Sequence, residues 1–429
     1  MDRSRVRVND EFVPSDLVAN AHQTTAAALP TVIESAKSPF FYWEAPSGFR
    51  MACGGSAHTI ATQDSARLSG FDSTVAKLWR NLQYDGPAVA RPRFVCGRAF
   101  ESKANDERWS AFPTAWGLLP AVTVSDTDDG TWMTTVNEDG PPLQTDTEPE
   151  QESIAILEND PRPDGRVWRN TAREIRRSIT NGPNQKVVFA HARDIKLNRP
   201  LDRRTAIECV RAENPESYIV YVEPEPNHCF VTATPERLVR KHGSSVHTEA
   251  LAGSTRRGRD CQEDLQFADA LDESHKNSQE HSLVVAAITE TLESLGGDVE
   301  VGPRRVTKLT RVQHLKTPIN AVCPQQHSIF SLVDRLHPTP AVGGTPTASA
   351  LDTINRFEPF GRGWYAAPVG WMDANGDGVF TIGIRSGVFT KTNGRIFAGA
   401  GIVAESDVHE EWDECQLKYR PLIDAFDRS

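Results

Sequence analysis

The C-terminal third of the chain alternates short apolar runs with tight turns, and this pattern constrains the fold more than any other feature. An apolar run over residues 363–372 precedes the turn Asp-Ala-Asn-Gly-Asp-Gly, and further runs follow over residues 379–389 and 395–403. Asn-Gly and Asp-Gly pairs close two-stranded hairpins because they tolerate a positive φ. The sequence therefore predicts neighbouring antiparallel strands in this region.

Strand and helix patterns also occur before this region. Short strands are predicted over residues 40–43, 93–100, 116–124, 186–190, 218–222 and 228–232. Helical periodicity covers residues 155–179, although Pro161 and Pro163 interrupt its first half, then residues 264–295 as the longest helix, and residues 410–426. Runs of strands with helices between them predict an α+β architecture with much antiparallel sheet.

The length of the chain and a change in its composition suggest a division near residue 150. A chain of 429 residues exceeds the size at which one core usually divides, so two domains are the first expectation and one large unit is the alternative. Residues 125–152 are acidic and rich in Thr, Pro and Gly, which predicts an exposed loop or linker.

Composition excludes several classes of protein. With 38% hydrophobic and 24% charged residues, the chain is expected to be soluble and globular. Its apolar stretches are too short for a membrane span, and no apolar segment follows the charged N-terminus, so a cytoplasmic location is expected. The seven cysteines form no Cys-x-x-Cys pair, which argues against disulfides and structural zinc. A net charge of −11 disfavours nucleic-acid binding.

Several charged residues in helices and beside strands are candidates for chemistry. Glu411 and Glu414 share one face of the last helix, and Glu280 lies within the longest helix. Mg²⁺ prefers such oxygen ligands, but taken alone helical glutamates are usually solvated surface residues. Lys186 and Glu249 would act as base and acid only if their surroundings shift their pKa values, and most such residues are plain surface charges.

Taken together, the segments that follow Lys186 resemble the chorismate-utilising enzyme family, which includes isochorismate, salicylate, anthranilate and aminodeoxychorismate synthases. The matching segments, in the order of the family, are residues 230–238, 249–254 with 256–258, 276–281, 312–315, 336–344, 362–365 with 368–371, 384–386, 399–402 and 411–418. The N-terminal part matches loosely, through residues 94–100 and 109–120.

The resemblance implies one large domain over residues 1–429, with two antiparallel sheets forming a sandwich, helices packed outside and the active site between the sheets. It replaces the two-domain expectation. Residues 1–150 would be a divergent part of the same sandwich, with the acidic loop at 125–152, and residues 153–429 would form the catalytic core.

The resemblance also implies a reaction in which water attacks C2 of chorismate while the C4 hydroxyl leaves. Lys186 would deprotonate the water and Glu249 would protonate the leaving hydroxyl. Glu280 and Glu414 would hold Mg²⁺, which grips the ring carboxylate, while Glu411 would orient a metal-bound water. The substrate-binding residues implied by the matching segments are Arg385, Gly399, Gly401, Tyr365, His314, Ala341, Gly253 and Lys418. Of these, Arg385 with the amides around Gly399 and Gly401 would hold the pyruvyl carboxylate.

Three residues favour the isochorismate synthase branch. Lys186 resembles the lysine of the water-adding and salicylate-forming branches, since glutamine stands there in the aminating ones. Ala252 replaces the nucleophilic lysine of aminodeoxychorismate synthases, and Ala341 stands where salicylate synthases carry threonine. Two residues depart from the family pattern: Thr232 replaces a usual glycine, and Asn277 replaces a common acidic residue near the metal, which would weaken Mg²⁺ affinity.

Two alternatives stay open: a salicylate synthase, or a relative that binds chorismate without turnover. The product would feed menaquinone synthesis, which we favour slightly, or siderophore or salicylate synthesis. Chorismate is the expected small-molecule partner, no amidotransferase subunit is expected, and a monomer or a homodimer would both fit.

Overall fold

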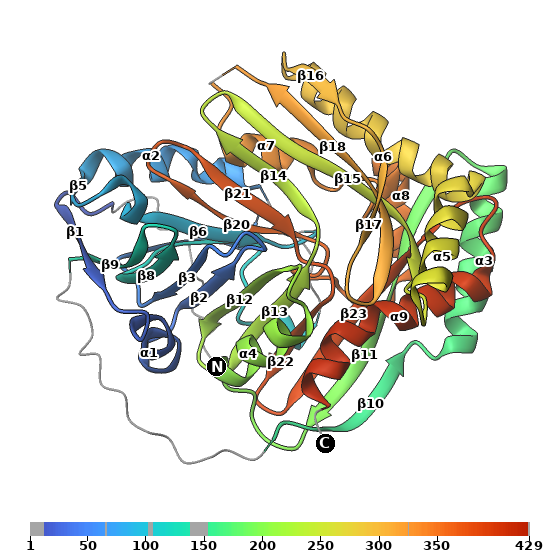
Figure 1. Cartoon of the computed structure of the whole chain (residues 1–429), viewed down its shortest axis with the longest axis horizontal. Helices are drawn as coiled ribbons and strands as arrows, with labels where there is room; N and C mark the ends of the chain where they lie inside the picture. Colours follow the sequence, from blue (N-terminus) through green and yellow to red (C-terminus); the bar gives the residue numbers. More distant parts are fainter. Residues whose placement is uncertain (1–12, 65–66, 102–105, 138–152, 325, 428–429) are drawn as a thin grey trace.

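The computed structural model describes residues 13–64, 67–101, 106–137, 153–324 and 326–427. Within these residues the strands form two large sheets with helices around them (Figure 1), which confirms the predicted α+β fold of two sheets. The pairings near the pocket described below are antiparallel, whereas β1 and β5 at one edge run parallel.

The first sheet has 13 strands in the described residues. Their order is β10 (Ile156–Arg162), β11 (Lys186–Leu197), β23 (Asn393–Ile402), β22 (Ser386–Thr390), β13 (His228–Thr234), β12 (Tyr218–Glu225), β2 (Phe40–Glu44), β3 (Arg50–Gly54), β8 (Val122–Thr127), β9 (Gly130–Val136), β1 (Leu17–Thr24) and β5 (Leu82–Asp85), and β19 (Gly344–Thr345) pairs with β11.

The second sheet has 10 strands in the same described part of the chain. Their order is β16 (Asp298–Val301), β18 (Val312–Val322), β15 (Ser245–Arg256), β14 (Arg237–His242), β21 (Gly378–Ile382), β20 (Pro368–Asp373), β6 (Arg93–Arg98), β7 (Ala115–Leu119) and β4 (His58–Thr62), and β17 (Arg305–Lys308) pairs with β18.

Helices cover the sheets and connect their strands. They are α1 (Ala28–Ser35), α2 (Asp72–Asn81), α3 (Gly165–Asn181), α4 (Arg203–Glu213), α5 (Cys261–Glu273), α6 (His275–Ser294), α7 (Ile329–Leu336), α8 (Thr347–Phe357) and α9 (Val408–Phe426). Two of them bring side chains to the pocket: α6 packs against β15 of the second sheet, and α9 packs against β23 of the first (Figure 1). In the described part of the chain, no helix combines the length and the apolar character that a membrane crossing needs.

The N-terminal strands are shared between both sheets. β2 lies beside β12 in the first sheet, and β6 lies beside β20 in the second. The two halves of the chain are thus hydrogen-bonded to one another, as a single domain requires, and the domain boundaries themselves stay a prediction.

Local sequence explains where α3 begins and which face it buries. The carboxylate of Asp164 accepts hydrogen bonds from the backbone amides of Arg166 and Val167, which satisfies donors that the first turn leaves free. Trp168, Ala172, Ile175 and Ile179 follow at four- and three-residue intervals and are buried. The predicted helix over residues 155–179 is wrong in its first half, since residues 156–162 form β10. That strand lies at the sheet edge, where the missing amide of Pro161 is tolerated.

The predicted single helix over residues 264–295 is divided in two at Ser274. Ser274 is extended, with φ −64° and ψ 116°, and its side chain accepts a hydrogen bond from the amide of Asn277. Serine favours this capping geometry over a place inside a helix, so α5 ends at Glu273 and α6 begins at His275.

The predicted loop over residues 125–152 is wrong in its first part. β8 and β9 form a hairpin there, with Thr123 opposite Thr134 and Ser125 opposite Trp132. The acidic residues Asp128 and Asp129 stand in the hairpin turn, while threonines suit the pleated strands. Residues 138–152 lie outside the described residues.

Candidate active site

A cavity lies between the two sheets, where small-molecule sites are often formed. The first sheet contributes β11 and β23 to its walls (Val188, Phe397, Ala398, Gly399, Gly401), and the second sheet contributes β15 and β18 (Leu251, Ala252, Gly253, Ser254, His314). Connecting loops contribute Pro235, Glu236, Ala341, Val342, Tyr365, Ala366, Ile384 and Arg385. The helices α6 and α9 contribute Glu280, Glu414 and Lys418. Most of the residues predicted from sequence are therefore brought together: Arg385, Gly399, Gly401, Tyr365, His314, Ala341, Gly253, Lys418, Glu280 and Glu414 line one cavity, and Lys186, Glu249 and Glu411 do not.

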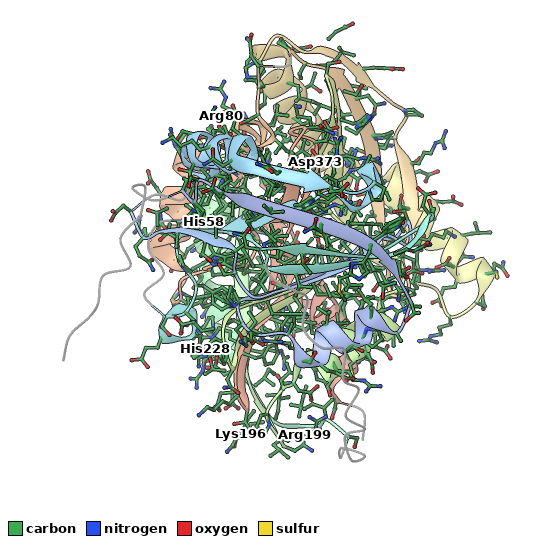
Figure 2. All side chains as sticks on the ribbon, turned by 90° about the vertical axis from the view of Figure 1, so that its left-hand side faces the viewer. His58, Arg80, Lys196, Arg199, His228 and Asp373 are labelled. Carbon is green, nitrogen blue, oxygen red and sulfur yellow. The ribbon has the colours of Figure 1, made fainter. Side chains whose placement is uncertain are left out.

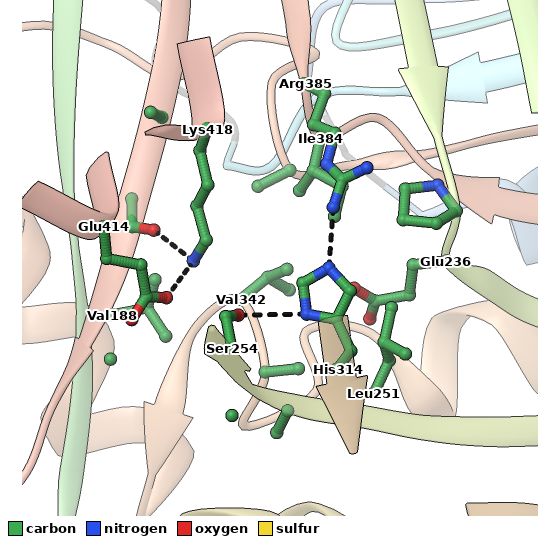
Figure 3. A pocket seen from close by; sticks show the side chains of 18 of the residues that line it. Val188, Glu236, Leu251, Ser254, His314, Val342, Ile384, Arg385, Glu414 and Lys418 are labelled. Carbon is green, nitrogen blue, oxygen red and sulfur yellow. Dashed lines mark hydrogen bonds and ion pairs between the residues drawn. The ribbon is translucent and has the colours of Figure 1, made fainter. Parts of the chain in front are cut away.

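Arg385 is the buried cation of this cavity, and it is held by a neutral histidine (Figure 3). Its Nη2 donates to Nε2 of His314 at 2.7 Å, and the other ring nitrogen, Nδ1, lies 3.0 Å from Oγ of Ser254. Burial, then the charge of Arg385, lowers the pKa of His314 well below its usual value. The imidazole is therefore neutral and can accept a hydrogen bond from the guanidinium.

Glycine residues shape the cavity where other side chains come close. At Gly253 φ is +77°, and the pairing of β15 with β18 shifts register between Ala252 and Ser254. This bulge turns Ser254 towards His314. A Cβ added at Gly399 would lie 2.9 Å from the hydroxyl of Tyr365, whose ring stacks on Phe397. Only glycine leaves room for that aromatic wall.

Three carboxylates meet at the end of the cavity formed by α6 and α9, and each is paired with a lysine. Glu280 lies 2.8 Å from Nζ of Lys186, Glu414 lies 2.6 Å from Nζ of Lys418, and Glu411 pairs with Lys276. These are oxygen donors from two helices, as predicted for a magnesium site. Within the described residues, however, no three His, Cys, Asp or Glu side chains form a ready-made metal cluster.

The charges at this end are strongly coupled. Burial, then the charge of Glu414, raises the pKa of Glu411 to about 7, even though Lys276 opposes the shift. Burial would also raise the pKa of Glu280, but the ammonium of Lys186 together with Lys276 and Lys418 lowers it overall. The donor chemistry thus fits a divalent cation, because added positive charge here relieves repulsion between carboxylates. Glu411 also accepts a 2.7 Å hydrogen bond from Ser406, which fixes its orientation.

Lys186 lies directly behind the wall of the cavity. Its side chain is 1% exposed, and it starts β11, whose neighbour β23 carries Gly401. A Cβ at Gly401 would stand 2.8 Å from Cε of Lys186 and closer still to the carboxylate of Glu280, so only glycine leaves room for this ion pair beside the cavity.

The structure contradicts the predicted position of Glu249. Its carboxylate points to Arg237, at 3.1 Å, and to Lys316, at 2.8 Å, and it does not line the cavity. Both oxygen contacts are thus made with protein cations outside the cavity, so the carboxylate is not placed to reach a substrate there. The sequence could not reveal these partners, because Arg237 lies in β14 and Lys316 in β18.

Glu236 is the acid that the sequence analysis missed. It lines the cavity, is 5% exposed, and follows Pro235 where the chain passes from β13 to β14 (Figure 3). Burial, then the charge of Glu249, raises its pKa to about 7, although Lys186, Lys418 and Arg385 oppose the shift. A carboxyl group with a pKa near neutrality is suited to proton donation. The available signal was its place in the matching segment 230–238, directly after a buried strand.

Comparison with known proteins identifies the family of this chain. The family model described as "Chorismate binding enzyme" matches residues 15–427. "Salicylate biosynthesis isochorismate synthase" of Pseudomonas aeruginosa is 32% identical over 417 residues, which are 91% of this chain and 85% of that protein. "Isochorismate synthase MenF" of Bacillus subtilis is 36% identical over 276 residues, which are 64% of this chain but only 58% of that protein.

A solved structure agrees with the fold. MenF of Escherichia coli, described as the menaquinone-specific isochorismate synthase, aligns with a TM-score of 0.80 over 96% of each chain at 24% identity. The chain belongs to the chorismate-binding enzyme family. Within that family it groups with the isochorismate synthases, which confirms the predicted family and branch.

Proposed function

We propose that this chain is an isochorismate synthase that adds water at C2 of chorismate and expels the C4 hydroxyl. The proposal rests on one observation: Glu236 and Arg385 line the same cavity. Glu236 is a buried carboxyl group with a pKa of about 7, and Arg385 is a buried guanidinium. The names of the isochorismate synthase relatives support the choice of substrate.

Glu236 takes the role of general acid that the sequence analysis gave to Glu249. In its neutral form it donates a proton to the departing C4 oxygen, so that water leaves instead of hydroxide. The charge of Glu249 helps to keep that proton in place, because a nearby negative charge disfavours ionisation of Glu236. Glu249 therefore supports the acid without touching the substrate.

Lys186 takes the role of general base. It must give up its own proton and accept one from the attacking water, which becomes the new C2 hydroxyl. One proton enters the enzyme at Lys186 and one leaves at Glu236, so the product is an isomer of the substrate. In this structure the amine pairs with Glu280 and the side chain lies next to the cavity beside Gly401.

Arg385 and the backbone around Gly399 and Gly401 hold the pyruvyl carboxylate. A guanidinium can donate two parallel hydrogen bonds to a carboxylate, and Nη2 is already fixed by His314. Immobilising the substrate between acid and base removes much of the orientational cost of the displacement. Tyr365 forms part of the aromatic wall.

Glu280 and Glu414 would hold Mg²⁺, and Glu411 would orient a ligand of the ion. When bound, Mg²⁺ supplies the positive charge that binds and neutralises the ring carboxylate of chorismate. Lys186 and Lys418 would then turn away from these glutamates, since each is now paired with one of the two carboxylates that would bind the metal.

Two alanines of the cavity wall support isomerisation over the other reactions of the family. Ala252 offers no amine for a covalent adduct. Ala341 lines the cavity, and the resemblance implies threonine at this position in salicylate synthases. The pathway, whether menaquinone or siderophore, the cytoplasmic location and the oligomeric state stay predictions.

The test is turnover of chorismate with Mg²⁺, followed by chromatography and mass detection of the product. We expect a product of unchanged mass, and we expect Lys186→Ala to lose almost all activity. Lys196→Ala is the matched control, because Lys196 lies on the same strand with a side chain that is 49% exposed, at the edge of the molecule (Figure 2). Loss of pyruvate from the product would instead identify a salicylate synthase, and equal loss in both variants would refute the role of Lys186.

A further inference from the structure

Two connections between the sheets run side by side at the cavity, and they carry Glu236 and Arg385. The chain passes from β13 to β14 through Pro235 and Glu236, and from β21 to β22 through residues 383–385. The amide of Ile382 donates to the carbonyl of Glu236 at 3.1 Å, and the amide of Ala233 donates to the carbonyl of Arg385 at 3.1 Å. These two backbone hydrogen bonds therefore hold the two connections next to each other.

Arg385 has an unusual backbone conformation in this connection. Its φ is +50°, the left-handed region that side chains other than glycine rarely adopt. Such a conformation costs energy and persists only where neighbouring contacts enforce it, which is often at a functional site. The conformation matters here because it sets the direction in which the guanidinium leaves the backbone.

Thr232 supplies a contact that enforces this turn. Its Oγ1 donates to the carbonyl of Ile384 at 2.6 Å, one residue before Arg385. Thr232 itself is fully buried, and β13 pairs it with Val220 on one side and Ser386 on the other. Because its backbone is fixed on both sides, its hydroxyl is a rigid anchor for the turn.

The position of the Arg385 guanidinium depends on the same turn. Nη2 reaches Nε2 of His314 in β18 of the second sheet, while Thr232 lies in the first sheet. The arginine thus runs from an anchored backbone to its acceptor His314 along one side of the cavity (Figure 3). A relaxed turn would withdraw the guanidinium from His314 and from the space where a carboxylate would bind.

We propose that Thr232 is a positioning residue whose hydroxyl holds the Ile384–Arg385 turn and thereby aims Arg385 at the substrate carboxylate. The inference rests on the proposed function, since that function gives Arg385 its carboxylate. By the resemblance stated in the sequence analysis, Thr232 replaces a usual glycine of the family, and glycine has no hydroxyl to make this contact.

The test compares Thr232→Val, which keeps the shape but loses the hydroxyl, with Thr232→Ser, which keeps the hydroxyl. We expect Thr232→Val to raise KM for chorismate about tenfold, the effect of one lost hydrogen bond, with a much smaller change in kcat. Thr232→Ser should restore KM to near the wild-type value. If Thr232→Val folds poorly, Thr232→Ala gives the same comparison with less crowding.

The matched control is Thr134→Val. Thr134 is also buried in a strand and donates to a carbonyl, that of Ala90, at 2.7 Å, but in β9 and away from the cavity. It should lower the melting temperature as Thr232→Val does while leaving KM unchanged. In an Arg385→Ala background, Thr232→Val should add nothing further to KM. An equal KM effect from the control, or an additive effect in the double variant, would overturn the proposal.

A crystal structure of Thr232→Val separates this proposal from the proposed function. The proposal predicts that the turn relaxes and that Arg385 leaves His314, whatever reaction the enzyme performs. An unchanged Arg385 would refute the positioning role even if chorismate is turned over. A displaced Arg385 in a protein that does not convert chorismate would refute the proposed function alone.

Discussion

Replacing Glu236 with glutamine tests the chemical role of the buried acid most sharply. Glutamine keeps the size of the side chain and cannot donate a carboxyl proton to the leaving oxygen. General acid catalysis contributes roughly a hundredfold to ten-thousandfold, or about 3–5 kcal/mol of barrier. We therefore expect Glu236→Gln to lower kcat by that factor with a small change in KM.

The pH dependence follows from the same carboxyl group. Because its pKa is raised to about 7 and the acid works in its protonated form, kcat/KM of the wild type should be high below pH 7 and fall above it. Glu249→Gln removes the negative charge that opposes ionisation of Glu236. This variant should stay active, with the fall in kcat/KM moved to lower pH.

The pH dependence of the free energy of unfolding tests the burial of Glu236 independently. The pKa rises from the ordinary glutamate value of 4.5 to about 7 in the folded protein, and each unit corresponds to about 1.4 kcal/mol. The folded state therefore binds this proton more tightly, and ionisation destabilises it by roughly 3 kcal/mol once the pH exceeds 7. The penalty is absent below pH 4.5 and develops between the two pKa values.

Glu236→Gln should accordingly be more stable than the wild type at pH 8, and the difference should disappear near pH 4.5. The assays are initial rates with chorismate from about pH 5.5 to 9, and urea unfolding at about pH 8 and about pH 4.5. The reasoning is refuted if Glu236→Gln keeps more than about a tenth of the activity, or if Glu249→Gln is the variant that loses it.

Further predictions concern the metal end, the lysine and the pocket wall. Gly401→Ala places a Cβ 2.8 Å from Cε of Lys186 and closer still to the carboxylate of Glu280, so it should reduce kcat/KM at least about tenfold; full activity would show that this ion pair needs no such space. Glu411→Gln should raise the Mg²⁺ concentration needed for half-maximal activity by roughly tenfold, measured after EDTA treatment and titration; activity that survives EDTA would speak against the metal. Glu358→Gln breaks a fully buried ion pair with Arg362 at 2.6 Å and should lower the free energy of unfolding by roughly 3–5 kcal/mol in urea, whereas a change below about 1 kcal/mol would contradict it.

The sequence predicts the architecture well where its signals are local. Hairpin turns, the buried run of β11 and the four- and three-residue spacing of α3 all appear as expected. The resemblance supplies what local patterns cannot, because it places strands from both halves of the chain in shared sheets. The errors at Ser274 and Pro161 arise where one side chain makes a cap, or where an edge position tolerates a missing amide.

The choice between Glu236 and Glu249 shows the limit of sequence reasoning at the site. Both carboxylates lie in matching segments, Glu249 within β15 and Glu236 in the connection between β13 and β14. Their roles are decided by tertiary neighbours: Glu249 is paired with Arg237 and Lys316 away from the cavity, whereas Glu236 lines the cavity and burial raises its pKa. The sequence does not reveal the ion pair between Lys186 and Glu280 either, because the two residues are 94 positions apart in the chain (280 − 186).

Conversion of chorismate in H₂¹⁸O is the most direct test of the central claim that the cavity adds solvent water at one carbon while hydroxyl leaves another. The account predicts an isomer of chorismate that carries one ¹⁸O atom at C2, formed by the wild type and almost absent with Lys186→Ala or Glu236→Gln. An unlabelled isomer, or a product that has lost pyruvate, would contradict it.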